Sequence, residues 1–124
     1  MEFDSKSEMQ RYMQLLQSQG MGLISQLECQ KRYELAPRLT HTVYKQLKTK
    51  IKAVERLYCN AIHYTCDFFY YDCEKQQYVI EEVKSKYTKT IRDYPLRRNL
   101  VLRMIRQMNE TAGSELYSFN EIIY

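Results

Sequence analysis

Between its two prolines, Pro37 and Pro95, the chain runs from Arg38 to Tyr94 without a single glycine or proline. These two residue types are the ones that most often mark turns and end helices. Proline is also well tolerated at the first position of a helix, so Pro37 is a suitable place for one to begin. The stretch therefore predicts one continuous element of secondary structure.

Apolar residues recur along this stretch at a spacing that fits an α-helix. Two sets with a spacing of 18 residues are Tyr44, Ile62 and Ile80, and Ile51, Phe69 and Tyr87. Eighteen residues complete about five turns at about 3.6 residues per turn, so each set lies on one face of a straight helix. A coiled coil needs a repeat of seven that is kept throughout, and this sequence does not keep one. The sequence thus predicts one long helix over residues 38 to about 92.

Capping signals predict shorter helices at both ends of the chain. Ser5 followed by Glu8 has the spacing of a capping box, and Pro95 and Gly113 bound a helix near the C-terminus. The long helix is predicted to be ~70 Å over residues 44–91, about twice the ~35 Å width of a compact chain of this size. We therefore predict a single all-α domain over residues 1–124, extended rather than globular. Its elements are helices at 6–19, 23–35, 38–92 and 95–111, and an apolar tail at 113–124.

Positive charge is gathered in two blocks that flank an acidic segment. Residues 37–58 sum to +5 and residues 84–106 to +7, whereas residues 59–83 sum to −4, within a net charge of +4. Such blocks suit phosphate, lipid headgroups or an acidic protein. The alternative is that they are only the solvated surface of a helix. The second block contains a basic patch that consists of Arg97, Arg98, Arg103 and Arg106.

The middle of the predicted long helix is apolar on two faces, which a single supporting layer cannot bury. Aromatic residues are enriched at the cores of protein interfaces, so the second face is a candidate partner interface. The alternative is that the helix lies inside a small bundle formed by its own chain. The candidate interface residues are Leu57, Tyr64, Phe68, Tyr71 and Tyr78.

Cys59, His63 and Cys66 are the candidates for a metal site, because on a helix they lie close to one face and carry ligand atoms that suit zinc. A fourth ligand, such as Cys29 or His41, is then needed from another segment. The sequence has no paired cysteine knuckle. The alternative is that these are small side chains packed along a helix, and we expect no metal and no cofactor.

Cysteine spacing and the absence of catalytic motifs point away from redox chemistry and catalysis. Cys59, Cys66 and Cys73 are seven residues apart, which is ~10.5 Å along a helix and too far for a disulfide. We therefore expect free thiols. The sequence also lacks a glycine-rich phosphate loop, an H-E-x-x-H motif and a G-x-S-x-G motif, so we predict that the chain is not an enzyme.

The predicted function is that of a non-catalytic helical accessory or structural subunit, which bridges neighbouring subunits in a large multiprotein complex. The four cysteines, the size and the basic character favour a mitochondrial inner-membrane assembly, of the respiratory chain or ATP synthase, as the host. The alternative is a ribosome- or RNA-associated factor that binds phosphates through the basic blocks. Expected partners are other protein subunits, together with anionic lipid headgroups or RNA.

The expected location follows from the lack of targeting and spanning segments. No apolar run reaches the ~20 residues that cross a bilayer, so we predict no transmembrane segment. The N-terminal residues lack the apolar core of a signal peptide. We therefore expect synthesis without a signal peptide and a peripheral place at the mitochondrial inner membrane, or otherwise the cytoplasm.

Overall fold

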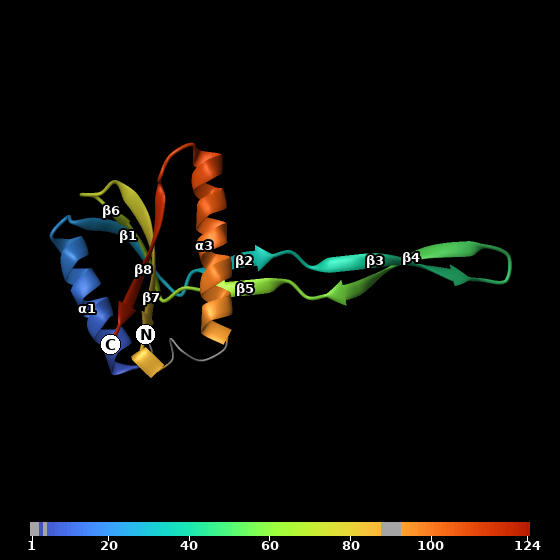
Figure 1. The fold of residues 1–124 in the computed structure, drawn as a ribbon, viewed down its shortest axis with the longest axis horizontal. Coiled ribbons are helices and arrows are strands. Elements are labelled where there is room, and N and C mark those ends of the chain that lie inside the picture. The colour runs from blue at the N-terminus through green and yellow to red at the C-terminus, as the bar shows by residue number, and fades with distance from the viewer. Residues whose placement is uncertain (1–2, 4, 88–92) are drawn as a thin grey trace. The chain divides into compact units, whose positions relative to one another are not determined.

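In the computed structural model, which describes residues 3, 5–87 and 93–124, the chain is mainly β rather than helical (Figure 1). Its elements, in chain order, are α1 (Lys6–Gly20), β1 (Ile24–Cys29), β2 (Arg32–Ala36), β3 (Leu39–Gln46), β4 (Ile51–Cys59), β5 (Ile62–Thr65), β6 (Phe68–Asp72), β7 (Gln77–Lys84), α3 (Asp93–Ala112) and β8 (Tyr117–Ile123). Within the described residues these strands form three sheets. The prediction of an all-α fold is therefore wrong.

The predicted long helix over residues 38–92 is replaced by the strands β3 to β7, and its last residues, 88–92, lie outside the described part of the chain. β-branched and aromatic side chains are frequent here, for example in residues 40–44 and 78–80, and such side chains favour strands. The 18-residue spacing could not discriminate between the two structures. Eighteen is a multiple of the two-residue period of a strand as well as of 3.6.

The terminal regions agree better with the prediction. The helices α1 and α3 coincide closely with the predicted helices at 6–19 and 95–111. The predicted helix at 23–35 is wrong, because β1 and most of β2 occupy this segment. The apolar tail at 113–124 contains β8.

The chain divides into two compact units. We call the first the sheet unit, which consists of Met1–Arg32 and Thr65–Tyr124, and the second the ribbon unit, Tyr33–Tyr64.

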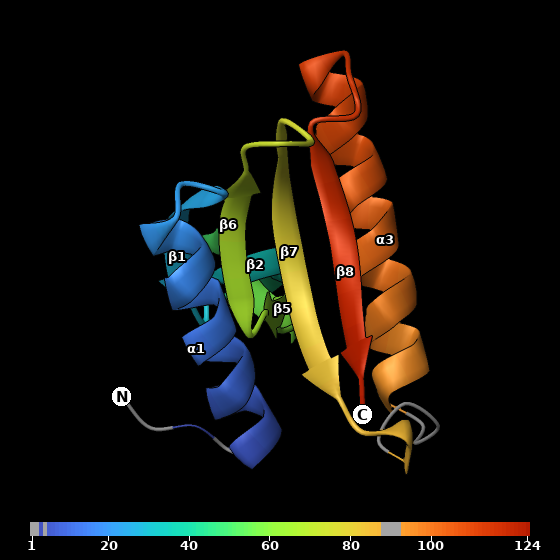
Figure 2. The same ribbon diagram turned by 90° about the vertical axis from the view of Figure 1, so that its left-hand side faces the viewer.

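The sheet unit is built around a four-stranded sheet in the order β1-β6-β7-β8 (Figure 2). The pairs β1–β6 and β6–β7 are antiparallel, whereas β7 and β8 are parallel. A parallel pair needs a crossover connection, and α3 lies in the connection between these two strands.

The helix α1 covers one face of this sheet. Its Leu15 is buried in the main hydrophobic cluster, which contains Leu15, Ile24, Phe68, Tyr70, Val79 and Val83. Phe68 is completely buried, and its ring stacks on that of Tyr12 from α1 with 6.2 Å between the centroids.

The helix α3 contacts the opposite face of the sheet. Val83 of β7 belongs to the main hydrophobic cluster beneath α1, so the side chain of its neighbour Glu82 lies on the opposite face of the sheet. Glu121 of β8 pairs with Glu82 and lies on that same opposite face. From α3, the Tyr94 hydroxyl donates a hydrogen bond to Glu121, and Arg98 forms an ion pair with the same carboxylate at 2.6 Å. One helix therefore packs against each face of the sheet.

The β6–β7 turn shows why the absence of glycine and proline did not predict continuity. The Asp72 carboxylate accepts the backbone N–H groups of Glu74 and Lys75 at 3.0 and 3.1 Å. Gln76 then takes a left-handed conformation with a φ of 55°. An aspartate that bonds to the backbone two and three residues on makes a tight turn without glycine or proline.

In the ribbon unit, β3 and β4 form a long antiparallel hairpin, which runs from the pair Leu39 and Cys59 to the pair Gln46 and Ile51. The turn closes with a hydrogen bond from the Leu47 N–H to the Lys50 carbonyl at 2.8 Å. The strands β2 and β5 form a second pair. Every residue of β3 and β4 is exposed or only partly buried.

Candidate active site

Four charged side chains gather at one end of the four-stranded sheet. We call them the carboxylate–lysine cluster, and they are Glu8, Asp67, Glu82 and Lys84. Asp67 directly precedes β6, and because Phe68 pairs with Glu81, Asp67 lies level with Glu82 on the neighbouring strand. The Asp67 N–H donates to the Glu81 carbonyl at 3.1 Å, which extends the ladder to this point.

Asp67 is held in a fixed orientation by the backbone of β7. Its Oδ2 accepts the N–H of Val83 at 2.7 Å. Burial, the charge of Glu82 and the hydrogen bond and charge of Glu8 together raise the pKa of Asp67 to about 8, against the opposing effect of the bond from Val83. The surroundings of Asp67 therefore disfavour its ionised form.

Glu82 and Lys84 are two residues apart on β7, so their side chains lie on the same face of the sheet. Lys84 Nζ is 3.0 Å from Glu82 Oε1, and Glu82 is only 4% exposed. Burial lowers the pKa of Lys84, but the charges of Glu82, Asp67 and Glu8 together outweigh burial and raise it. Lys84 is therefore a cation at neutral pH.

Glu8 comes from the first turn of α1, where its own N–H is capped by the Ser5 hydroxyl at 3.1 Å. It is 8% exposed. The position of Glu8 depends on how α1 is fixed to the sheet. Arg11, one turn further along α1, makes the contact that fixes the helix.

Arg11 forms a bidentate ion pair with Glu81, in which Nε and one terminal nitrogen donate to the two carboxylate oxygens at 2.8 Å each. Glu81 is completely buried, and it also accepts hydrogen bonds from the Tyr70 hydroxyl at 2.8 Å and the Asn120 amide at 3.0 Å. Both oxygens of this buried carboxylate thus accept a hydrogen bond from the Arg11 guanidinium, and Tyr70 and Asn120 add two polar donors at Oε1, so α1 is fixed to β7.

Carboxylate oxygens are the ligands that Mg²⁺, Mn²⁺ and Ca²⁺ prefer. Among the residues that the structure describes, no three His, Cys, Asp or Glu side chains are placed to hold an ion as they stand. Burial and the neighbouring carboxylates favour the protonated form of Asp67, and Lys84 is paired with one oxygen of Glu82. A divalent cation that displaces this proton fits the chemistry of the cluster.

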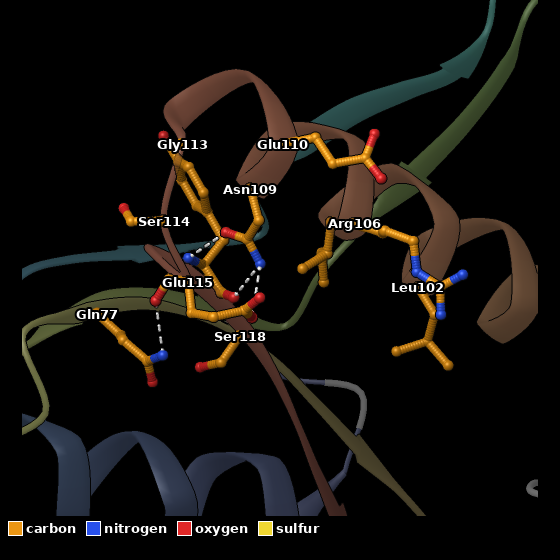
Figure 3. Close-up of a pocket in the computed structure, with 11 residues that line it drawn as sticks. Gln77, Leu102, Arg106, Asn109, Glu110, Gly113, Ser114, Glu115 and Ser118 are labelled. Carbon is orange, nitrogen blue, oxygen red and sulfur yellow. Dashed lines mark hydrogen bonds between the residues drawn. The ribbon is translucent and has the colours of Figure 1, made fainter.

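A hollow lies elsewhere, between α3 and the beginnings of β7 and β8 (Figure 3). Its polar groups already serve the local fold, because the Asn109 amide bonds to both backbone groups of Tyr117 and the Gln77 amide donates to the Glu115 carbonyl at 2.7 Å. Gln77 begins β7, whereas Glu82 and Lys84 lie near its end. We therefore place the candidate site at the cluster and not at this hollow.

The predicted basic patch lies on α3. Arg98 is paired with Glu121, and Arg103 donates to the Asn99 side chain at 2.7 Å, while Arg97 also has contacts. Arg98, Arg103 and Arg106 line a shallow cleft on this helix. The structure thus brings three of the four arginines together on one surface.

The predicted partner interface is not one continuous stripe. Phe68 is buried in the core beneath α1. Tyr71 is three residues further along β6 and therefore lies on the opposite face of the sheet. There its ring packs against that of Tyr78, with 4.9 Å between the ring centroids. In the ribbon unit, Leu57 is exposed and Tyr64 is buried.

The cysteines are all free thiols. Cys59 ends β4, His63 lies in β5 and Cys66 precedes β6, and the structure does not place these three described residues as a group that could hold a metal. Burial raises the pKa of Cys66 to about 12, so this thiol is a poor nucleophile at neutral pH.

Sequence reasoning missed the whole carboxylate–lysine cluster. A signal was present in the segment YVIEEVK, residues 78–84, where three charged residues follow an apolar run that reads as a buried strand. Charged residues in such a strand are rarely buried unless they are paired, so they mark a site or a network. The assignment of this segment to a helix hid that signal.

No helix in the described residues has the length and apolar character needed to cross a bilayer. No curated protein and no solved structure matches the chain. One family does match, over residues 1–115, under the description "protein of unknown function (DUF1064)". The match covers most of the sequence, so the chain belongs to the DUF1064 family.

Proposed function

We propose that this protein is a hydrolase that uses a divalent cation to cleave phosphodiester bonds in nucleic acid. The observation that carries the proposal is Asp67, which the Val83 N–H holds beside Glu82 and Glu8, where burial and these two carboxylates disfavour its negative charge. A buried carboxylate with a raised pKa beside other carboxylates is typical of a functional site. A divalent cation is the partner that would relieve their repulsion.

The side chains divide the work of such a reaction. Asp67 and Glu82 would offer oxygens to the cation, and Glu8 would add a third carboxylate from α1. When bound, the cation polarises a phosphoryl oxygen and lowers the pKa of the attacking water. Lys84, as a cation beside these carboxylates, would orient the water and stabilise the charge that develops on the phosphate.

Nucleic acid is the substrate class that the charge distribution supports. The acidic segment 59–83 contains two of the three carboxylates, and both flanking blocks, residues 37–58 and 84–106, are strongly basic. Basic surfaces supply most of the affinity for a phosphate backbone. The predicted RNA-associated role shares this chemistry and stays a prediction.

The proposal is tested by incubating the purified chain with plasmid DNA, single-stranded DNA and RNA in Mg²⁺ or Mn²⁺. We expect cleavage that stops in EDTA and returns when the metal is restored. Cleavage products with phosphate and hydroxyl ends would identify hydrolysis. Absence of cleavage of both DNA and RNA in either metal would overturn the proposal.

Metal should also change the dependence of stability on pH. The unfolded chain releases the Asp67 proton near pH 4, whereas the folded protein keeps it up to about pH 8. The folded state binds more protons in this window, so without metal the contribution of Asp67 to the free energy of unfolding falls as pH rises from about 4 to about 8. Added Mn²⁺ should therefore raise the Tm by about 5 °C or more at pH 8 and much less at pH 5.5.

Thermal unfolding at both pH values, with Mn²⁺ or with EDTA, measures this effect. The Asp67→Asn variant, which has no proton for the metal to displace, is the matched control and should show a much smaller shift at pH 8. Equal shifts at the two pH values would contradict the assignment of Asp67 as a metal ligand.

The predicted role as an accessory subunit of a mitochondrial assembly stays a prediction. The cluster supports a catalytic function instead, because a buried Asp67 whose ionised form is disfavoured beside two further carboxylates is more typical of a functional site than of a structural one. Cleavage assays with and without EDTA distinguish the two functions. A metal-dependent hydrolase loses its cleavage activity in EDTA, whereas a structural subunit shows no cleavage in either condition.

A further inference from the structure

The hairpin of β3 and β4 has one face that carries only positive charge. Lys45 lies directly opposite Lys52, and Arg56 adds a further positive charge on the same face. Like charges at paired positions of a sheet destabilise it. Such an arrangement is stabilised when an anion lies against it.

The two faces of the hairpin differ sharply. Side chains alternate along each strand, so the Lys45 face also contains Val43, Val54 and Arg56 and has no acidic residue. Glu55, the one acidic residue of these two strands, lies on the other face, where it accepts hydrogen bonds from the Thr40 and Thr42 hydroxyls. These bonds lower its pKa and keep its negative charge on that face.

Nothing in the ribbon unit covers the positive face. Lys45, Lys52 and Arg56 are exposed, and the turn at the tip adds the exposed Lys48 and Lys50. A two-stranded hairpin is only marginally stable in water by itself. The length and the positive charge of the hairpin therefore suit a surface that is stabilised when a polyanion binds to it.

We propose that the Lys45 face of the β3–β4 hairpin binds the groove of duplex DNA. A ribbon of two strands is ~26 Å long over eight residues, and its strands are ~4.8 Å apart. The major groove of B-DNA is ~12 Å wide and accepts a two-stranded ribbon. The major groove of duplex RNA is too narrow for side chains to read, so DNA is the better fit. The inference rests on the proposed function for its substrate class, and it adds the form of the nucleic acid and the surface that holds it.

The test measures binding of the full-length chain to a fluorescent ~20-base-pair DNA duplex in EDTA, where hydrolysis cannot interfere. The variant Lys45→Gln/Lys52→Gln should bind about tenfold more weakly or worse at ~100 mM salt, and its salt-dependence slope should fall by about 2, because two phosphate contacts are lost.

The matched control is Gln46→Glu/Ile51→Glu, which changes the net charge by the same amount at the neighbouring pair on the opposite face. It should lose much less affinity than the lysine variant. The variant Lys45→Arg/Lys52→Arg, which keeps the charge, should retain binding. Equal loss in the lysine variant and the Gln46→Glu/Ile51→Glu control would overturn the inference, since only net charge would then matter.

Two further outcomes are decisive. Equal or tighter binding to an RNA duplex of the same sequence would overturn the choice of DNA. Binding without cleavage in Mg²⁺ or Mn²⁺ would support the inference and sink the proposed hydrolase, whereas cleavage with unchanged affinity in the lysine variant would do the reverse.

Discussion

Replacing Asp67 by Asn should reduce metal-dependent cleavage by about a thousandfold or more, while the protein stays at least as stable at pH 8. The loss follows from removing one carboxylate from the cation, which supplies several kcal/mol of transition-state stabilisation. The stability is kept because burial and the charges of Glu82 and Glu8 already disfavour the ionised form of Asp67. The amide oxygen can still accept the Val83 N–H.

Asp72→Asn is the matched control, because Asp72 lies at the other end of β6, where it caps the turn. That variant should keep its activity and lose only a little stability. Steady-state cleavage rates and urea unfolding of both variants would check the expectation. An Asp67→Asn protein that is less stable and fully active would show that the cluster is structural.

Replacing Arg11 by Met should lower the free energy of unfolding by about 3–5 kcal/mol. Glu81 has no exposed surface, and the substitution leaves its charge with only the neutral donors of Tyr70 and Asn120. Removing one partner of a buried ion pair is strongly destabilising for this reason. Urea unfolding monitored by circular dichroism measures the change.

The double variant Arg11→Met/Glu81→Met should recover most of the loss, because an apolar pair of similar volume has no charge to desolvate. Arg98→Met is a useful comparison, since its pair with Glu121 is more exposed and should cost roughly 1 kcal/mol or less. A loss of that small size for Arg11→Met would mean that the Arg11–Glu81 pair does not fix α1 to the sheet.

Local signals in the sequence were sufficient to predict the helices whose ends depend only on neighbouring residues. The capping pair Ser5 and Glu8 begins α1, and Pro95 and Gly113 bracket most of α3. These signals work because caps, prolines and glycines act through the backbone of the residues beside them. The free state of the cysteines agrees with the expectation, but the helix from which it was argued does not exist.

The middle of the chain was misread because its pattern fits two structures. A spacing of 18 residues suits both a helix and a strand, and the turn at Asp72 forms without glycine or proline. The choice between the two depends on which strands pair, and pairing joins residues far apart in sequence, such as Tyr78 with Tyr117.

The sequence by itself determined the two terminal helices, the two basic blocks and the acidic segment between them. Only the tertiary structure decided that Glu8, Asp67, Glu82 and Lys84 form one site, because β6 and β7 must pair and α1 must dock on Glu81 before these side chains meet. Likewise, only the register of β3 and β4 collects Lys45, Lys52 and Arg56 on one face. Charge can be counted along a chain, but which charges face one another is set by long-range pairing.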